Sequence, residues 1–480
     1  MTFVRSSIWS LSTVANPWHP VVLAYAKAVK MMQSRPLNDP TSWRYQAAIH
    51  GLAATAPPPG APWNSCQHST WYFLPWHRMY LATFEEIVRA AVIADGGPAD
   101  WALPYWDYSG PAPANTLPLA FRSPTLPDNT PNPLFVAQRR GGSGANSING
   151  GAQINPVNTS STAAMASTVF TTPSSGFPVR FGGPATGFAH FGPAPGLIEN
   201  QPHNIMHVVI GGTGGLMTDP DTAALDPIFW LHHANIDRLW EMWRVDGGAN
   251  PTPLTWRRRT FRLRNSAGAI VKMRPESVVD TVGQLDYTYD SIPVVALPAG
   301  DPVAMTRSPR PKMIGRSDAR VQLGRAGAQS TVAVDPIAGT TAAASASGGD
   351  QRRVILELAD IEGTANPGVV YGVYVNLPAA RNDGSDRGRD EATLELHRVG
   401  LVSLFGIEHS TAAGSPNPQP LRYRFDITDV VDLLRVTGDV TELSVELLPL
   451  DPDDVDDDAA ASAAAARPAV TVGTIAVHTG

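Results

Sequence analysis

The 480-residue sequence contains a single cysteine and no long hydrophobic run. One cysteine excludes a framework of disulfide bonds within the chain. No apolar stretch is long enough to span a bilayer, and the N-terminal residues contain no apolar segment typical of a signal peptide. We therefore expect a soluble protein without a membrane anchor, located in the cytoplasm.

Basic residues are also scarce, since charged residues make up 16% of the chain and the net charge is −7. Without a basic stripe, a nucleic-acid partner is not expected. The one locally basic run, RRRTFRLR at 257–264, alternates Arg with Thr, Phe and Leu. This alternation favours a strand with one solvated face over an anion site.

The first 250 residues predict helices joined by long loops. Apolar residues recur at helical spacing, and Pro or a capping residue such as Thr41 or Ser42 stands near several starts. A segment rich in Pro, Gly, Ser and Asn, about 108–198, interrupts this pattern as a functional loop or a disordered insertion. The predicted helices are 19–32, 41–50, 75–92, 201–210 and 226–243.

After residue 250 short apolar runs with Gly and Asp turns predict strands, among them RVILELAD, VVYGVYVNLP, LRYRFDI and ELSVELLPL. We expect a mainly α domain over 1–296, a Pro-rich linker over 297–315 and an all-β domain over 316–480, built as a sandwich or jelly roll. The low-complexity stretches 340–350 and 451–466 are expected to be solvated loops.

Twelve histidines are distributed unevenly, and eight of them lie in or beside the predicted helices. His203 and His207 are four residues apart, so both rings project from one helix face. His77 lies on the apolar stripe of its helix, and His232 and His233 follow the apolar run DPIFWL. A purely structural role would require several independent coincidences. The pattern predicts a metal site supported by His50, His68, His77, His203, His207 and one of the adjacent pair.

Copper suits this ligand set best. The zinc-protease motif HExxH is absent, and a non-haem iron triad needs a carboxylate ligand, which no spacing offers here. Six neutral imidazoles fit two ions with three histidines each. Nitrogen ligands without charge compensation favour cycling between Cu(I) and Cu(II).

The motifs YQAAIHG, CQHSTWYFLPWHRMYLATFEEI, ENQPHNIMHVVIGG and DPIFWLHHANIDRLW resemble those of the type 3 copper proteins: tyrosinases, polyphenol (catechol) oxidases and haemocyanins. The resemblance implies a four-helix bundle around two coppers, the first held by His50, His68 and His77. His203, His207 and His233 would hold the second, which makes His232 a supporting residue. Helical spacing alone does not choose between His232 and His233.

By the same resemblance to fungal tyrosinases and molluscan haemocyanins, Cys66 is expected to form a thioether to His68, which would fix a ligand on a loop. The alternative is a small buried thiol. Glu199 and Asn204 match the family segment that holds a water near the second copper, where they would help to deprotonate a phenol. Glu199 alternatively serves as an acid near a helix N-terminus.

Other residues are expected to support the site. No aromatic residue stands in GGLMTDPDTAAL, so Met217 or Pro220 would border an open pocket that accepts bulky phenols. Phe84 is expected to pack against a ligand imidazole and Asp237 to orient one. Arg5 and the pair Tyr287 and Tyr289 resemble the motif that closes the catalytic domain of the family.

The strand-rich third resembles the C-terminal domain of plant-type polyphenol oxidases, which covers the copper site and keeps the enzyme latent. Together these resemblances imply an oxidase that uses O2 to hydroxylate small monophenols and to oxidise o-diphenols to o-quinones. Proteolysis near 297–312 or within 333–350 is expected to raise its activity. The alternatives are a catechol or o-aminophenol oxidase without monophenolase activity, a haemocyanin-like oxygen carrier and, remotely, a di-zinc hydrolase. The sequence indicates no oligomeric state.

Overall fold

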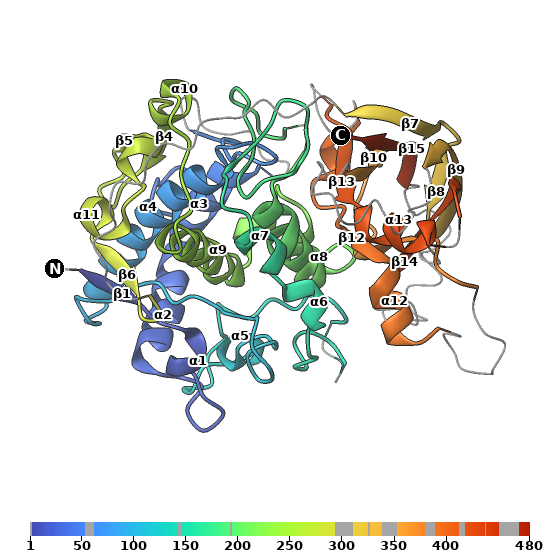
Figure 1. The fold of residues 1–480 in the computed structure, drawn as a ribbon. Helices are drawn as coiled ribbons and strands as arrows, with labels where there is room; N and C mark the ends of the chain where they lie inside the picture. The colour runs from blue at the N-terminus through green and yellow to red at the C-terminus, as the bar shows by residue number, and fades with distance from the viewer. Residues whose placement is uncertain are drawn as a thin grey trace. The chain divides into compact units, whose positions relative to one another are not determined.

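The structure is a computed structural model of the chain (Figure 1). It describes residues 2–480 except 53–61, 143, 145, 193, 293–310, 325–326, 338–352, 380–388, 412–417, 437 and 451–469. The chain forms two compact units, one comprising Met1–Thr172 with Arg180–Met305 and the other Pro173–Val179 with Thr306–Gly480. In the described part, no helix is long and apolar enough to cross a membrane.

The first unit is mainly helical, as the sequence predicts. Its longer helices are α2 (Pro20–Ser34), α3 (Trp43–His50), α4 (Phe73–Ala94), α8 (Ile205–Gly211) and α9 (Ile228–Val245). The shorter helical pieces are α1 (Ile8–Leu11), α5 (Leu119–Arg122), α6 (Pro156–Thr159), α7 (Thr162–Met165), α10 (Leu254–Arg257) and α11 (Thr281–Leu285). A π-helical segment η1 (Glu199–Asn204) and 3₁₀ turns η2 (Leu216–Thr218), η3 (Ala223–Leu225) and η4 (Pro275–Ser277) complete this set.

Local sequence explains where these helices begin. Pro20 opens α2, where its missing N–H costs nothing, and His19 Nδ1 accepts from the Val21 amide. Ser42 caps α3 by accepting from the Tyr45 amide at 3.2 Å. Asp226 does the same before α9, accepting from the Ile228 amide at 3.1 Å.

Helices α4 and α9 pack against each other and form the centre of this unit (Figure 1). Most side chains of α4 are buried, including Leu81, Phe84 and Val88 on the predicted stripe. Burying such a side chain stabilises the fold by roughly 1.5–3 kcal/mol. The two helices therefore hold their polar groups on a rigid, well-packed support.

The first unit also contains three pairs of short strands. Strand β1 (Phe3–Arg5) pairs in parallel with β6 (Tyr287–Tyr289), and β2 (Thr171–Thr172) pairs with β3 (Gly183–Pro184). The second half of the basic run forms β4 (Phe261–Arg264), which pairs with β5 (Ile270–Met273) in a hairpin. Phe261 and Leu263 are buried while Arg262 is exposed, as predicted for a strand with one solvated face. The predicted strand was too long at its start, because Arg257 ends α10.

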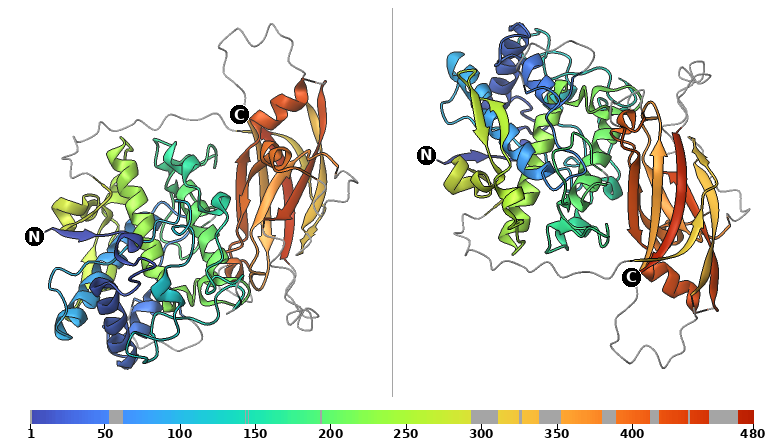
Figure 2. Two further views of the ribbon diagram at one scale, coloured as in Figure 1. Left: turned by 90° about the horizontal axis from the view of Figure 1, so that it is seen from below. Right: turned by 90° about the horizontal axis from the view of Figure 1, so that it is seen from above.

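The second unit is built on a nine-stranded sheet in the order β12-β11-β14-β9-β7-β15-β10-β13, with β8 paired to β15. All its pairings are antiparallel, and Figure 2 shows the strands running side by side in a curved sheet. The strands are β7 (Lys312–Ser317), β8 (Val321–Leu323), β9 (Ala328–Ile337), β10 (Val354–Glu362), β11 (Tyr371–Val375), β12 (Arg398–Val402), β13 (Leu421–Asp426), β14 (Val440–Pro449) and β15 (Val470–Thr479). Helices α12 (Glu391–His397) and α13 (Thr428–Arg435) and the turn η6 (Ile407–His409) accompany them.

An aliphatic core holds the second unit together. Val332 and Val334 alternate with exposed residues on β9, whereas Leu356, Leu358 and their neighbours on β10 are almost continuously buried. The predicted β-rich domain is confirmed, as one antiparallel, barrel-like sheet.

The predicted domain limits differ from the structure in two places. The expected linker 297–315 overlaps strand β7, which begins at Lys312, and the rest of it up to 310 lies outside the described residues. Pro173–Val179 also groups with the second unit, although sequence order suggested the first. The low-complexity stretches 340–350 and 451–466 lie outside the described residues.

Candidate dicopper centre

Six histidines predicted as ligands converge inside the first unit, and each is at most 3% exposed. They come from the end of α3, the loop before α4, α4 itself, η1, α8 and α9. The ring centroids of His50, His68 and His77 lie 5.1–5.5 Å apart. Those of His203, His207 and His233 lie 4.6–5.6 Å apart.

The two triads face each other. The rings of His77 and His233 stack with centroids 4.5 Å apart, and His68 lies 6.0 Å from His203. Ligand atoms of His50, His77 and His233 form one close group, and those of His203, His207, His232 and His233 form another. The arrangement provides two adjacent sites, each with three or more imidazoles.

Hydrogen bonds select the ring nitrogen that would face the metal. The Nδ1 atoms of His50, His77 and His207 bond the backbone carbonyls of Pro220 (2.9 Å), Phe73 (2.8 Å) and Met217 (2.8 Å). A carbonyl only accepts, so each Nδ1 carries the proton and each Nε2 keeps its lone pair.

The lone pairs of these rings point into the cluster. The Nε2 atoms of His50 and His77 are buried and have no hydrogen-bond partner, and those of His207 and His233 lie 3.4 Å apart. Buried acceptors that face each other without a donor are costly unless a cation lies between them.

Burial keeps these rings neutral. Removal from water lowers the pKa of His50 to about 3, and burial together with neighbouring histidines lowers the pKa values of the other five well below the usual range. Neutral imidazole is the form that binds a metal. The all-nitrogen donor set fits copper better than the hard cations, which prefer oxygen.

Cys66 lies beside His68, as the expected thioether requires. Its Sγ is 3.3 Å from His68 Nδ1, and burial raises the pKa of the thiol well above its usual value. A residue that the sequence did not single out, His190, is equally close, with Nδ1 3.1 Å from the same sulfur.

The segment around His190 also pairs with the loop that carries His68. The His68 amide donates to the His190 carbonyl (3.1 Å), the Gly192 amide donates to the His68 carbonyl (2.8 Å), and the Phe191 ring stacks on His68. No spacing signal in the sequence links residues 122 positions apart, so this contact is visible only in the fold.

Glu199 is buried at the edge of the site. Its Oε1 accepts from the Ser69 amide at 2.6 Å, next to His68, while Oε2 has no hydrogen-bond partner. Burial raises the pKa of this carboxyl well above its usual value, against the lowering effect of the Ser69 amide. Asn204 Oδ1 accepts from His203 Nδ1 at 2.8 Å and so orients that ring.

The sequence predicted that His203 and His207 share one regular helix, and this prediction is wrong. Gln201 has extended backbone angles, and η1 carries His203 while α8 carries His207. Their rings still lie 4.6 Å apart, so the expected convergence is kept. His232, predicted as a supporting residue, stacks on His203 and bonds Tyr108 through Nδ1 at 3.2 Å.

Two supporting roles are corrected. Phe84 packs on Trp230 and Trp43, not on an imidazole. Phe73 and Phe229 take that role instead, with their centroids 4.7 Å from His77 and 4.2 Å from His233. Each stands four residues before the histidine that it touches, a helical spacing that could have identified it.

Asp237 orients no ring. Its carboxylate accepts from Arg78 Nε and from the hydroxyls of Tyr287 and Tyr289, and it pairs with Arg5. Burial alone would raise its pKa, but the charges of Arg78 and Arg5 lower it below the usual value. Asp237 therefore anchors the Arg5 and tyrosine motif that joins β1 and β6 to α9.

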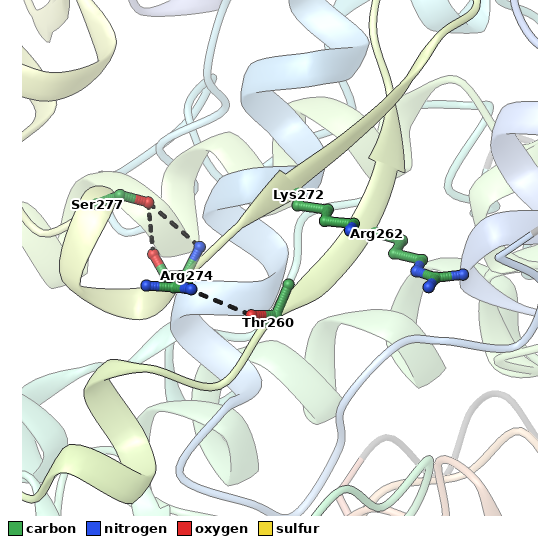
Figure 3. Close-up of a pocket in the computed structure, with 5 residues that line it drawn as sticks. All are labelled: Thr260, Arg262, Lys272, Arg274 and Ser277. Carbon is green, nitrogen blue, oxygen red and sulfur yellow. Dashed lines mark hydrogen bonds between the residues drawn. The ribbon is translucent and has the colours of Figure 1, made fainter.

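Met217 and Pro220, predicted to border an open pocket, lie behind the ligand histidines instead. The Met217 side chain is fully buried, and Met217 and Pro220 contribute backbone carbonyls to ligand histidines. A separate hollow of about 610 Å³ lies on the β4–β5 hairpin, lined by Thr260, Arg262, Lys272, Arg274 and Ser277 (Figure 3). None of the histidines lines it.

Comparisons with known proteins match both units. Residues 40–246 match the common central domain of tyrosinase, and residues 310–479 match a domain of unknown function (DUF7868). The chain is 36% identical to tyrosinase HcTyr1 of Hahella sp. (strain CCB-MM4) over 94% of its own length and 96% of that protein. It is 30% identical to the chloroplastic polyphenol oxidase of Vitis vinifera, of which it spans about half (46%), over 57% of its own length.

Solved structures share the fold over the whole chain. A recombinantly expressed latent aurone synthase (polyphenol oxidase) aligns with a TM-score of 0.64 at 20% identity, covering 100% of this chain and 89% of that one. Latent apple tyrosinase aligns with a TM-score of 0.60 at 19% identity, covering 99% and 97%. At these identities the likeness concerns the fold alone.

Proposed function

The chain belongs to the tyrosinase family and is a dicopper oxidoreductase, and from this premise we propose that it uses O2 to hydroxylate monophenols and to oxidise o-diphenols to o-quinones. The observation that carries the proposal is the convergence of six neutral, buried imidazoles, whose ring centroids lie within 5.6 Å of one another in each predicted triad.

The six histidines would bind the two copper ions in two sets of three. His50, His68 and His77 would hold one copper, and His203, His207 and His233 the other. The bound copper pair supplies the O2-binding and electron-transfer chemistry that the side chains lack. The carbonyls behind Nδ1 fix the rings of His50, His77 and His207, so these side chains lose little entropy on metal binding.

Glu199 is proposed to accept the phenol proton through a water. Its Oε1 is fixed by the Ser69 amide, and its Oε2 is buried without a partner. A carboxylate with a raised pKa is a stronger base than an exposed one. A monophenol must lose its proton before it can be hydroxylated, whereas a catechol is a more acidic and easier substrate.

The test compares two substrates. After reconstitution with copper, the wild type should oxidise both tyrosine and 4-methylcatechol. Glu199→Gln should reduce hydroxylation about 100-fold and catechol oxidation much less, while Glu446→Gln, a buried glutamate of the second unit, should change neither. Equal losses on both substrates would refute the role of Glu199. Oxygen binding without phenol turnover, even after proteolysis, would favour an oxygen carrier.

The thioether between Cys66 and His68 is part of the proposal. Formation of the S–C bond removes the thiol hydrogen and one ring hydrogen, and O2 accepts the two electrons and two protons. Mass spectrometry of the copper-loaded protein should find the cross-linked peptide two hydrogen masses lighter. It should be absent in Cys66→Ser, and its absence from the wild type would refute the bond.

We also propose that the second unit keeps the enzyme latent. The two structural neighbours, latent aurone synthase and latent apple tyrosinase, are latent enzymes, and both align over nearly all of this chain. Limited trypsin treatment should therefore raise catechol turnover, followed in parallel by gel and by assay. Unchanged turnover after clean removal of the second unit would contradict latency.

A further inference from the structure

We propose that one short loop, Leu216–Asp221, couples the two copper sites by orienting a ligand of each. The inference rests on the proposed dicopper function of the histidine cluster. The Pro220 carbonyl accepts a hydrogen bond from His50 Nδ1 of the first triad, and the Met217 carbonyl accepts one from His207 Nδ1 of the second. Only two residues separate the two acceptors, so neither carbonyl can move far without the other.

The loop is tied at both ends. The Thr222 hydroxyl donates to the Leu216 carbonyl at 2.7 Å and closes the loop on itself. The Thr218 hydroxyl donates to the Gly212 carbonyl at 2.6 Å and joins it to the end of α8. The Asp221 amide donates to Asp219 Oδ1 at 2.8 Å. These bonds make the segment one stiff unit instead of two independent carbonyl acceptors.

Two glycines let the loop approach both ligand helices. Gly51 directly follows His50, and a Cβ there would overlap the Pro220 carbonyl oxygen. Gly211 ends α8, four residues after His207, and a Cβ there would overlap the Thr218 hydroxyl. The loop therefore packs against the C-terminal ends of α3 and α8 at the same time, and a side chain at either position would displace it.

Two other ligands serve as internal controls. His77 bonds a carbonyl of its own helix, and His203 bonds the side chain of its neighbour Asn204. Neither contact involves the loop. Removal of a ligand that bonds the loop should therefore affect the opposite copper site, whereas removal of a ligand that does not should leave that site unchanged.

The first experiment measures copper affinity by competition with a chelator. His207→Ala and His203→Ala each remove one ligand from the second site, so the tightly bound copper remains with the intact first triad. We expect its dissociation constant to rise about tenfold in His207→Ala relative to His203→Ala, a typical size for coupling between sites.

Because one loop contacts both triads, the opposite pair of variants should behave in the same way. His50→Ala should weaken copper in the second triad about tenfold relative to His77→Ala. Equal dissociation constants within both pairs would overturn the coupling, even if the wild type binds two coppers and oxidises catechol. A chain that binds no copper would overturn the coupling and the proposed function together.

A second variant keeps every ligand. Gly51→Ala should displace Pro220 and weaken both coppers by about tenfold, in line with the loss of outer-shell partners. Gly187→Ala is the matched control, because a Cβ there has no neighbour within 4 Å. Circular dichroism checks that both variants fold. If Gly51→Ala weakened copper binding at the first site only, the loop would not couple the two sites.

Discussion

The interiors of the two units differ in kind. The second unit is filled with aliphatic side chains of β9, β10, β14 and β15. The first unit buries six ligand imidazoles and, behind them, a charged network of Arg5, Arg78, Glu85 and Asp237. Buried charges and unpaired ring nitrogens cost free energy that aliphatic contacts do not. We therefore expect metal binding and buried ion pairs to contribute more to the stability of the first unit, whereas aliphatic packing dominates the described core of the second.

The largest expected effect breaks the charged network. Asp237→Asn leaves Arg5 and Arg78 buried without their shared anion, and it should destabilise the first unit by about 3–5 kcal/mol. Hydrogen exchange of the full chain, read peptide by peptide, should show faster exchange in α4, α9, β1 and β6. Unchanged protection in these elements would show that the network is not required.

The matching change in the second unit opens a cavity. Leu356, fully buried on β10, should cost about 2–5 kcal/mol when replaced by Ala. The loss should appear in denaturant unfolding of the full chain and in exchange of the β10, β13 and β15 peptides. Copper affinity should not change. A larger dissociation constant for copper would contradict the conclusion that the core of the second unit is independent of the metal site.

Removal of copper tests the comparison without a mutation. At free copper 100 times the dissociation constant, binding should stabilise the first unit by about 2.7 kcal/mol. Chelation should therefore raise hydrogen exchange in α3, α4, α8 and α9 and leave β7–β15 as they were. An equal change in both units would mean that their stabilities are not separable.

The smallest expected effect compares two helix caps. Ser42 caps α3, which ends at His50, and Asp390 caps α12 by accepting from the Thr393 amide at 2.7 Å. Either change to Ala should cost about 1 kcal/mol of stability. Only Ser42→Ala should also weaken copper binding, measured by chelator competition. A comparable weakening in Asp390→Ala would contradict the independence of the site from the second unit.

The sequence predicted the longer helices, a minority of the strands and a converging set of histidines, because helical and strand periodicity and ligand spacing are local properties of the chain. The choice of His233 over His232 came from the family resemblance. It also contained the signal for Phe73 and Phe229, four residues before ligands, although Phe84 was selected in their place. It did not predict the kink at Gln201, since the break within 199–211 comes from backbone geometry that residue spacing does not record.

Contacts between distant segments belong to the tertiary structure alone. The approach of His190 to Cys66, the Asp237 network with Arg5, and the carbonyls of Met217 and Pro220 behind two ligand rings all join residues far apart in the chain. The sequence by itself determined which side chains are candidate metal ligands, because ligand chemistry is carried by residue type. Only the fold decided which backbone groups orient them, since every residue offers the same carbonyl and its position depends on packing.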